Sequence, residues 1–131
     1  MSSRAKRDNF QFKVVEMIAV IFEVFPTSNG KQEYFEIAGE LKQHLSVIEG
    51  FISIERFQSL VDPNKILSLS FWENEEAVTN WRNLEAHRIA QSKGRQELFE
   101  DYRIRVGNIV RDYSLEQRKQ VPGDSQLVHS D

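Results

Sequence analysis

Apolar and polar positions change their spacing several times along the chain, and each change marks an expected element. Residues 17–25 (MIAVIFEVF) are β-branched and aromatic and stop at Pro26, which predicts a strand with both faces covered. Turn and capping residues follow at 27–30. Beyond them, apolar residues recur every three or four positions over 34–48, which predicts an amphipathic helix.

Alternation then replaces the helical spacing. Residues 51–60 and 66–72 alternate between apolar and polar, and the turn residues between them predict an antiparallel hairpin. Asn74 is suited to cap a second helix, with two glutamates following it in the first turn. Residues 102–113 alternate again, which predicts a last strand.

The predicted order is βαββαβ, with a break in the second helical region somewhere within 83–94. This order indicates an α+β, ferredoxin-like domain, in which a four-stranded antiparallel sheet carries both helices on one face. The expected organisation is a flexible N-terminal arm at 1–15, a domain at 16–113 and a C-terminal tail at 114–131.

Parity assigns the residues of the three later strands to the two faces of this sheet. Those expected on the helix-covered face are apolar: Ile52, Ile54, Leu67, Leu69, Phe71, Ile104 and Val106. Those expected on the other face are mixed: Ser53, Glu55, Phe57, Ser68, Ser70, Trp72, Arg103, Arg105, Gly107 and Ile109. Such a face is too apolar for water and too polar for a dry core. We therefore expect a homodimer whose facing sheets enclose a ligand-sized cavity.

Composition narrows the classes of function. The 131 residues are 40% hydrophobic and 28% charged, as expected for one globular domain, and the absence of cysteine excludes disulfides and thiolate chemistry for this chain. The formal charge of −3 and the short apolar runs make nucleic acid and membrane unexpected partners. The N-terminus lacks a secretory pattern, so the expected location is cytoplasmic, and the scattered histidines predict no metal site.

Two residues are candidate catalytic groups. His87 is a candidate base, with a haem ligand or a polar residue at the helical break as alternatives, and Trp81 lies on an apolar stripe that also suits a core. Glu55 and Arg105 share a predicted face, where we expect a cross-strand ion pair, with orientation of a ligand as the alternative. The candidate pocket-lining residues are Glu55, Phe57, Ser68, Ser70, Trp72 and Arg105.

The segment SFWENEEAVTNWRNLEAHRIAQSKGR, followed by DYRIRVGNIVRDY, resembles the antibiotic biosynthesis monooxygenase family. Its most specific parts are the Phe71-Trp72 strand end, the EEA helix start, Trp81 and the His87-Arg88 pair. The resemblance implies the family's dimeric α+β barrel. It also implies oxidation of a small aromatic or quinone-like substrate by molecular oxygen, with a protein base and no cofactor, in a site that excludes water.

Two other functions stay open at this point. A related branch binds and degrades haem through a Trp, a His and an Asn. Here His87 follows Trp81 too closely for that pattern, and residues 17–25 contain no Asn, so haem is an alternative to the expected absence of a cofactor. Because no unmistakable acid–base pair is present, the chain is also compatible with a non-catalytic dimeric protein that binds small molecules or is associated with stress.

Overall fold

The computed structural model describes residues 16–91 and 95–123; the predicted arm at 1–15, residues 92–94 of the predicted helical break and residues 124–131 of the predicted tail lie outside this part. The described elements follow in the order β1 (Ile18–Pro26), α2 (Lys31–Leu45), β2 (Phe51–Gln58), β3 (Ile66–Trp72), α3 (Glu75–Gln91), α4 (Arg95–Leu98) and β4 (Phe99–Asn108).

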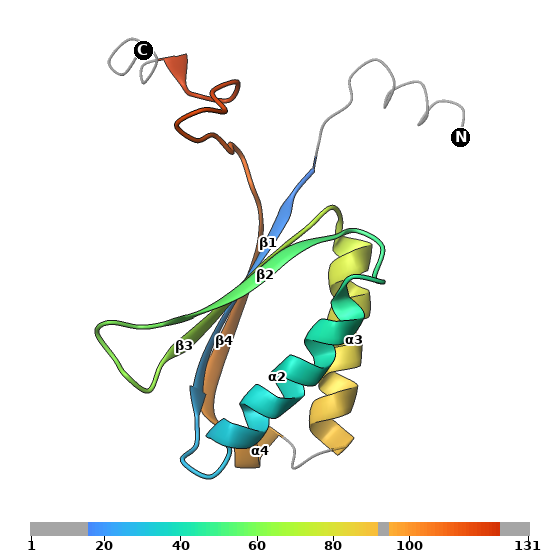
Figure 1. Ribbon diagram of the computed structural model, residues 1–131, viewed down its shortest axis with the longest axis vertical. Coiled ribbons are helices and arrows are strands. Elements are labelled where there is room, and N and C mark those ends of the chain that lie inside the picture. Colours follow the sequence, from blue (N-terminus) through green and yellow to red (C-terminus); the bar gives the residue numbers. More distant parts are fainter. Residues whose placement is uncertain (1–15, 92–94, 124–131) are drawn as a thin grey trace.

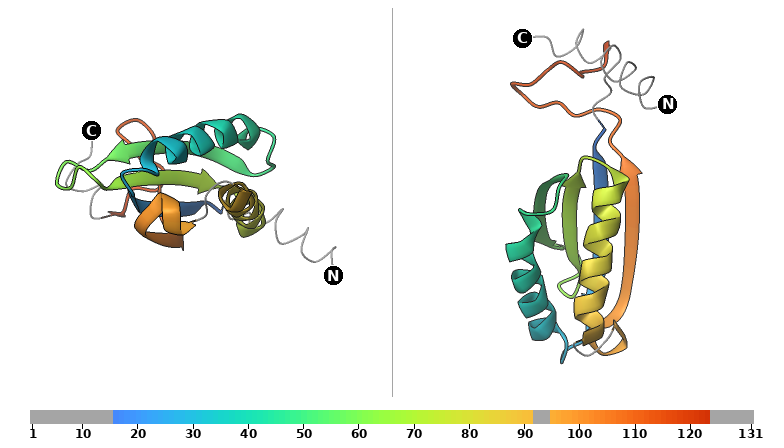
Figure 2. Two further views of the ribbon diagram at one scale, coloured as in Figure 1. Left: turned by 90° about the horizontal axis from the view of Figure 1, so that it is seen from below. Right: turned by 90° about the vertical axis from the view of Figure 1, so that its right-hand side faces the viewer.

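The strands form one antiparallel sheet with the order β2-β3-β1-β4. The two long helices lie on the same face of this sheet, with α2 towards β2 and α3 towards the centre, while β4 runs along the edge beyond α3 (Figures 1 and 2). The predicted ferredoxin-like α+β fold is therefore confirmed. No helix in the described residues is long and apolar enough to cross a membrane.

Helix α3 is continuous to Gln91, and its buried Ile89 belongs to the core. The rest of the range predicted for the helical break, up to residue 94, lies outside the described residues. Both predicted boundaries of the last strand are wrong. Strand β4 begins at Phe99, three residues before the predicted 102, since the Phe99 ring packs edge-on against Phe22 and Tyr34. It ends at Asn108 because its neighbour β1 begins at the paired Ile18.

Local caps agree with the sequence. The Oδ1 of Asn74 accepts a hydrogen bond from the Ala77 N–H at 2.8 Å, so Asn74 caps α3 as predicted. In the turn before α2, the Thr27 hydroxyl accepts from the Gly30 N–H at 2.8 Å and donates to the Glu97 carbonyl at 2.7 Å. This pair of bonds connects the start of α2 with α4.

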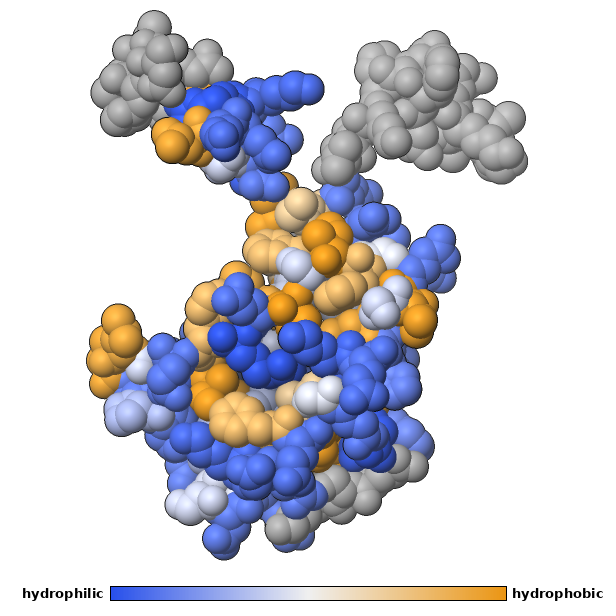
Figure 3. Space-filling view, viewed as in Figure 1, coloured by the Kyte–Doolittle hydropathy of each residue, from blue (hydrophilic) through white to orange (hydrophobic). Residues whose placement is uncertain are grey.

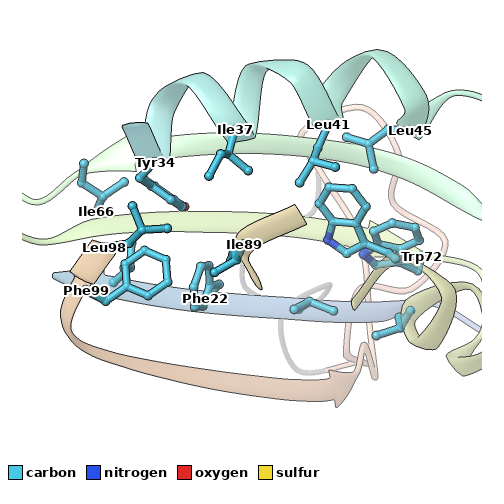
Figure 4. Close-up of a cluster of buried hydrophobic side chains, with 14 of the residues drawn as sticks. Phe22, Tyr34, Ile37, Leu41, Leu45, Ile66, Trp72, Ile89, Leu98 and Phe99 are labelled. Carbon is cyan, nitrogen blue, oxygen red and sulfur yellow. The ribbon is translucent and has the colours of Figure 1, made fainter. Parts of the chain in front are cut away.

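The core lies between the sheet and the helices (Figure 4). Its largest fully buried side chain is Trp72, at the end of β3, which stacks on Trp81 of α3 with ring centroids 6.1 Å apart. The Phe51 ring packs edge-on against the same indole at 5.3 Å. Burial of these three aromatic rings therefore fastens α3 to one end of the sheet.

The predicted parity of β3 is wrong. Ser68, Ser70 and Trp72 are buried on the helix side, where they pair with buried residues of β1, and the partly exposed residues between them are on the open face: Leu67, Leu69 and Phe71. The reason is specific tertiary packing, because the Trp72 indole contacts Trp81 and Phe51 on the helix side and its N–H finds a partner there.

The other strands follow the prediction except at one position. Register with β1 puts Ile104 and Val106 on the helix side, and Ile54 packs against the core. Register also puts Glu55, Phe57, Arg103 and Arg105 on the open face, as predicted. A register shift between Phe51 and Ser53 turns Ile52 out of the expected alternation, and its side chain is 41% exposed.

The turn between α2 and β2 depends on Gly50, the one described residue with a positive φ, at 93°. A Cβ at this position would lie 2.8 Å from the Ala77 Cβ. We therefore expect Gly50→Ala to lower the free energy of unfolding by about 1–3 kcal/mol, from backbone strain and the close contact with α3. Urea unfolding followed by circular dichroism measures the change.

The matched control is Gly39→Ala in α2, where an added Cβ has no neighbour within 4 Å. This change is expected to raise stability by roughly 0.5–1 kcal/mol, because alanine favours a helix. A Gly50→Ala protein as stable as the native chain would show that the turn does not require glycine.

Candidate functional site

A cleft of about 370 Å³ lies between α3 and the edge of the sheet formed by β1 and β4. It exists because α3 does not fully cover the edge strand, so that Tyr102 and Ile104 on the helix side stay 41% and 39% exposed. The Phe22 ring forms its floor from β1, and Ile89 of α3 closes one side. The cleft is therefore open to solvent along β4 and apolar at its base.

An aromatic group forms one wall of this cleft. The rings of Phe22, Phe99 and Tyr102 contact each other edge-on, with centroid distances of 6.0, 6.0 and 5.9 Å. Edge-on contact of this kind adds to the stabilisation from burial alone. A planar or apolar ligand thus meets a preformed wall.

Polar side chains enter the same cleft from α3. Arg82 and Glu85 are three residues apart in the helix, which puts both on the face that looks onto the sheet, and Asn83 lines the outer part beside them. The cleft therefore combines an aromatic wall with a cation and a carboxylate.

A second pocket, of about 20 Å³, adjoins the cleft and shares Arg82 and Glu85 with it. We call this pocket the inner end of the cleft, and Ser68, Ser70 and Trp81 line it as well. Both serines come from β3 and are only 7% and 2% exposed. The Trp72 Nε1 donates a hydrogen bond of 2.8 Å to the Ser70 Oγ. Two hydroxyl groups thus lie at the inner end of the cleft, next to the charged groups of α3.

A buried tyrosine lies behind the aromatic wall. Tyr34 of α2 packs its ring against Phe99 at 5.3 Å and is 2% exposed. Burial raises the pKa of the Tyr34 hydroxyl, Arg56 opposes this increase, and the negative charge of Glu85 adds to it. Tyr34 therefore stays protonated at neutral pH. The charge of Glu85, a residue that lines the cleft, thus affects the pKa of a side chain buried in the core.

The predicted site residues fall into separate groups. Ser68, Ser70 and Trp81 line the inner end of the cleft, and the fully buried Trp72 supports Ser70 from behind. His87 is exposed on α3 and does not line the cleft. The remaining predicted pocket residues lie on the open face of the sheet: Glu55, Phe57 and Arg105.

The predicted ion pair between Glu55 and Arg105 is wrong, because β2 and β4 form opposite edges of the sheet. Arg105 instead contacts Glu23 of the central strand β1 at 3.3 Å, and Lys65 contacts the same carboxylate at 3.4 Å. Desolvation acts to raise the pKa of Glu23, but the two cations outweigh it and hold the pKa below its ordinary value. These charges belong to the open face and not to the cleft.

Sequence reasoning missed Arg82, Glu85 and Tyr102 as cleft residues. The spacing of Arg82 and Glu85 beside Trp81 was the available signal, since residues three apart share a helix face. That signal was weak because charges at this spacing usually face solvent. Only the position of α3 relative to β4 shows that these two face a cleft.

Two relatives with known sequences are similar to this chain. It is 42% identical over 105 residues to the jasmonate monooxygenase ABM of Pyricularia oryzae, a match that covers 80% of this chain and 49% of that protein. The chain thus spans about half the length of this relative. It is 28% identical over 93 residues to the uncharacterized protein YqjZ of Bacillus subtilis, covering 71% of this chain and 79% of the other.

Solved structures share the fold at low sequence identity. Protein SO0527 from Shewanella oneidensis superposes with a TM-score of 0.62 at 12% identity, covering 73% of this chain and 93% of that one. Rv0793 from Mycobacterium tuberculosis superposes with a TM-score of 0.59 at 15% identity, covering 76% of this chain and 95% of that one. Residues 17–93, more than half of the chain, match the family model described as antibiotic biosynthesis monooxygenase. The chain therefore belongs to the antibiotic biosynthesis monooxygenase family.

Proposed function

We propose that this chain is a monooxygenase that oxidises a small aromatic or quinone-like molecule in the cleft between α3 and the sheet. The observation that carries the proposal is the cleft itself, in which a carboxylate, a guanidinium and two hydroxyls surround an aromatic wall. Family membership and the relative named a monooxygenase support the type of reaction. The substrate class is the one that the family resemblance implies, and the aromatic wall of the cleft supports it.

In the proposed reaction Glu85 is the base that removes a proton from a phenol or from an activated CH₂ group of the substrate. The resulting carbanion reduces molecular oxygen and forms a carbon–oxygen bond. One oxygen atom ends in a new carbonyl group, and the other leaves as water with both hydrogens of the CH₂ group. Electrons come from the substrate, so this reaction requires neither metal nor flavin, and the apolar base of the cleft limits contact between water and the carbanion.

Glu85→Gln removes the proposed base but keeps the size and shape of the side chain. We expect oxygen uptake with a hydroxyanthrone to fall by about 10²–10⁴-fold, the usual contribution of a positioned base. An oxygen electrode measures the rate across a panel of polyphenols and anthrones.

The matched control is Glu76→Gln, which removes a carboxylate from an exposed position of the same helix and is expected to keep the native rate. Undiminished uptake by Glu85→Gln would contradict its role as base. Uptake that requires added haemin, with a Soret shift on titration, would replace the proposal by the haem alternative.

A carboxylate-bearing ligand is a second candidate, favoured by Arg82. This guanidinium lines both parts of the cleft, and no ion pair to it is present among the described residues. The similar protein from Pyricularia oryzae is named for jasmonate, a carboxylate. A cation beside the apolar lining of the cleft matches the anionic end of such a molecule.

Arg82→Gln tests this candidate. We expect jasmonate to bind roughly 10–100-fold more weakly, the loss of one charge-assisted hydrogen bond, while its uncharged methyl ester binds as to the native chain. Quenching of tryptophan fluorescence measures both, since Trp81 lines the cleft. Arg103→Gln, on the opposite face of the sheet, is the control. An equal loss of affinity for jasmonate and for its methyl ester would contradict the role of Arg82 in binding the carboxylate. Binding of jasmonate without oxygen uptake would favour a non-catalytic binding protein.

We also propose that a second copy of the chain covers the open face. The open-face residues of β3 and their neighbour Ile21 are apolar and only partly covered, and Met17, Ile52, Phe71 and Ile109 line a depression there. Leu60 and Val61, at the tip of the β2–β3 hairpin, are almost fully exposed, and hydrophobic side chains also gather at the upper end of the strands (Figures 1 and 3). An apolar surface of this kind favours association.

Light scattering at micromolar concentration is expected to give twice the mass of one chain. Leu69→Arg puts a charge at the centre of the open face and is expected to give the monomer mass, because an unpaired buried charge is costly. Thr79→Arg, on an exposed position of α3, is expected to leave the dimer intact. A monomeric native chain would exclude this arrangement.

A further inference from the structure

The Ser70 hydroxyl is buried, and one of its hydrogen-bonding roles, donation of its hydrogen, is unused. It lies on the core side of β3, 2% exposed, and its Oγ accepts the hydrogen bond from Trp72. A serine hydroxyl has one hydrogen to donate in addition to the lone pairs that accept. Within the described residues this hydrogen makes no hydrogen bond, and the side chain lines the inner end of the cleft. The hydrogen is therefore available to a ligand.

The Trp72 indole fixes this hydroxyl. Trp72 is fully buried, and its ring is held between Trp81 and Phe51, so the Nε1–H has one direction. Donation to the Ser70 Oγ polarises the hydroxyl and makes it a stronger donor, an effect that grows in an interior of low dielectric. Trp72 thus acts on the cleft through Ser70 without lining it.

The surroundings indicate which ligand atom this donor suits. Ser68, two residues along β3, presents a second hydroxyl from the same strand face, and Arg82 lines the same inner end. These three groups are donors. Glu85 lines the same end and is the proposed acceptor of the ligand's proton, which leaves its carboxyl neutral beside the ligand oxygen, and the rest of the lining is apolar. Such a subsite stabilises an oxygen atom that carries negative charge.

We propose that Ser70, held by Trp72, donates its hydroxyl hydrogen to the phenolate or enolate oxygen of the ligand. This inference rests on the proposed function and specifies where the reacting oxygen binds. The proton of the phenol or enol goes to Glu85, and Ser70 keeps its own proton while it stabilises the anion left on the ligand. The site therefore selects phenols and enols over their ethers, which form no such anion.

The probe for this subsite is 4-nitrophenol, whose phenolate is visible by its absorbance, with 4-nitroanisole as the matched ether. With native protein we expect the pKa of bound 4-nitrophenol to lie below that of the free phenol. In Ser70→Ala the pKa is expected to return towards the free value and phenolate affinity to fall roughly 10-fold, the effect of one hydrogen bond to a charged group. Affinity for 4-nitroanisole is expected to stay unchanged.

Two further variants distinguish the loss of the hydroxyl donor from a general disturbance of the structure. Ser70→Thr keeps the hydroxyl and is expected to keep the shifted pKa, whereas Trp72→Phe keeps an aromatic ring but removes the indole N–H and is expected to lose part of the shift. Ser53→Ala, which removes an exposed hydroxyl from the open face, is the control. Circular dichroism checks that each variant is folded.

The outcomes distinguish this assignment from the proposed function. The assignment of Ser70 would be overturned if the pKa of bound 4-nitrophenol were unshifted in both the native protein and Ser70→Ala. It would also be overturned if the phenol did not bind at all. If oxygen uptake still depends on Glu85 in that case, the proposed monooxygenase stands. If the Ser70-dependent shift is present but no phenol is oxidised, the subsite stands and the proposed reaction fails.

Discussion

Burial of the Trp72 indole between the sheet and α3 is the interaction on which the arrangement of the cleft depends. Stacking on Trp81 and edge-on contact with Phe51 fasten the start of α3 to one end of β3. The same burial turns Ser68 and Ser70 towards the helices. Two hydroxyls in an apolar interior are tolerated because one accepts the indole N–H and both line a cleft. One aromatic side chain thus sets both the position of the helix and the polarity of the cleft's inner end.

The position of α3 has a second consequence at the edge of the sheet. Because the helix lies over the inner strands, β4 keeps its helix-side residues half-exposed, and the space beside them becomes the cleft. The aromatic wall of Phe22, Phe99 and Tyr102 comes from the sheet, whereas Arg82 and Glu85 come from the helix. Helix α3 therefore contributes both to the core, through Trp81 and Ile89, and to the lining of the cleft, through Arg82 and Glu85.

The two faces of the sheet are suited to different tasks. The helix side contains the cleft with Arg82 and Glu85, and the open side carries apolar residues of β3 around the charged group of Glu23, Lys65 and Arg105. Those charges are mutually paired, which lowers the cost of covering them with another surface. The proposed substrate chemistry and the proposed self-association thus concern opposite sides of the sheet, so that a substitution on one side is a fair control for the other.

Periodicity alone determined most of the architecture. The strand at 17–25, the two helices, the hairpin, the Asn74 cap and the ferredoxin-like order all follow from local spacing, because amphipathic elements must bury one face. The faces of β3 were not determined in this way, since ILSLSFW alternates equally well in either orientation and only packing of Trp72 against Trp81 decides between them. Periodicity likewise did not determine that Arg82 and Glu85 face the cleft. Local spacing cannot show which parts of the sheet a helix leaves uncovered, and that is decided by tertiary contacts between residues far apart in the chain.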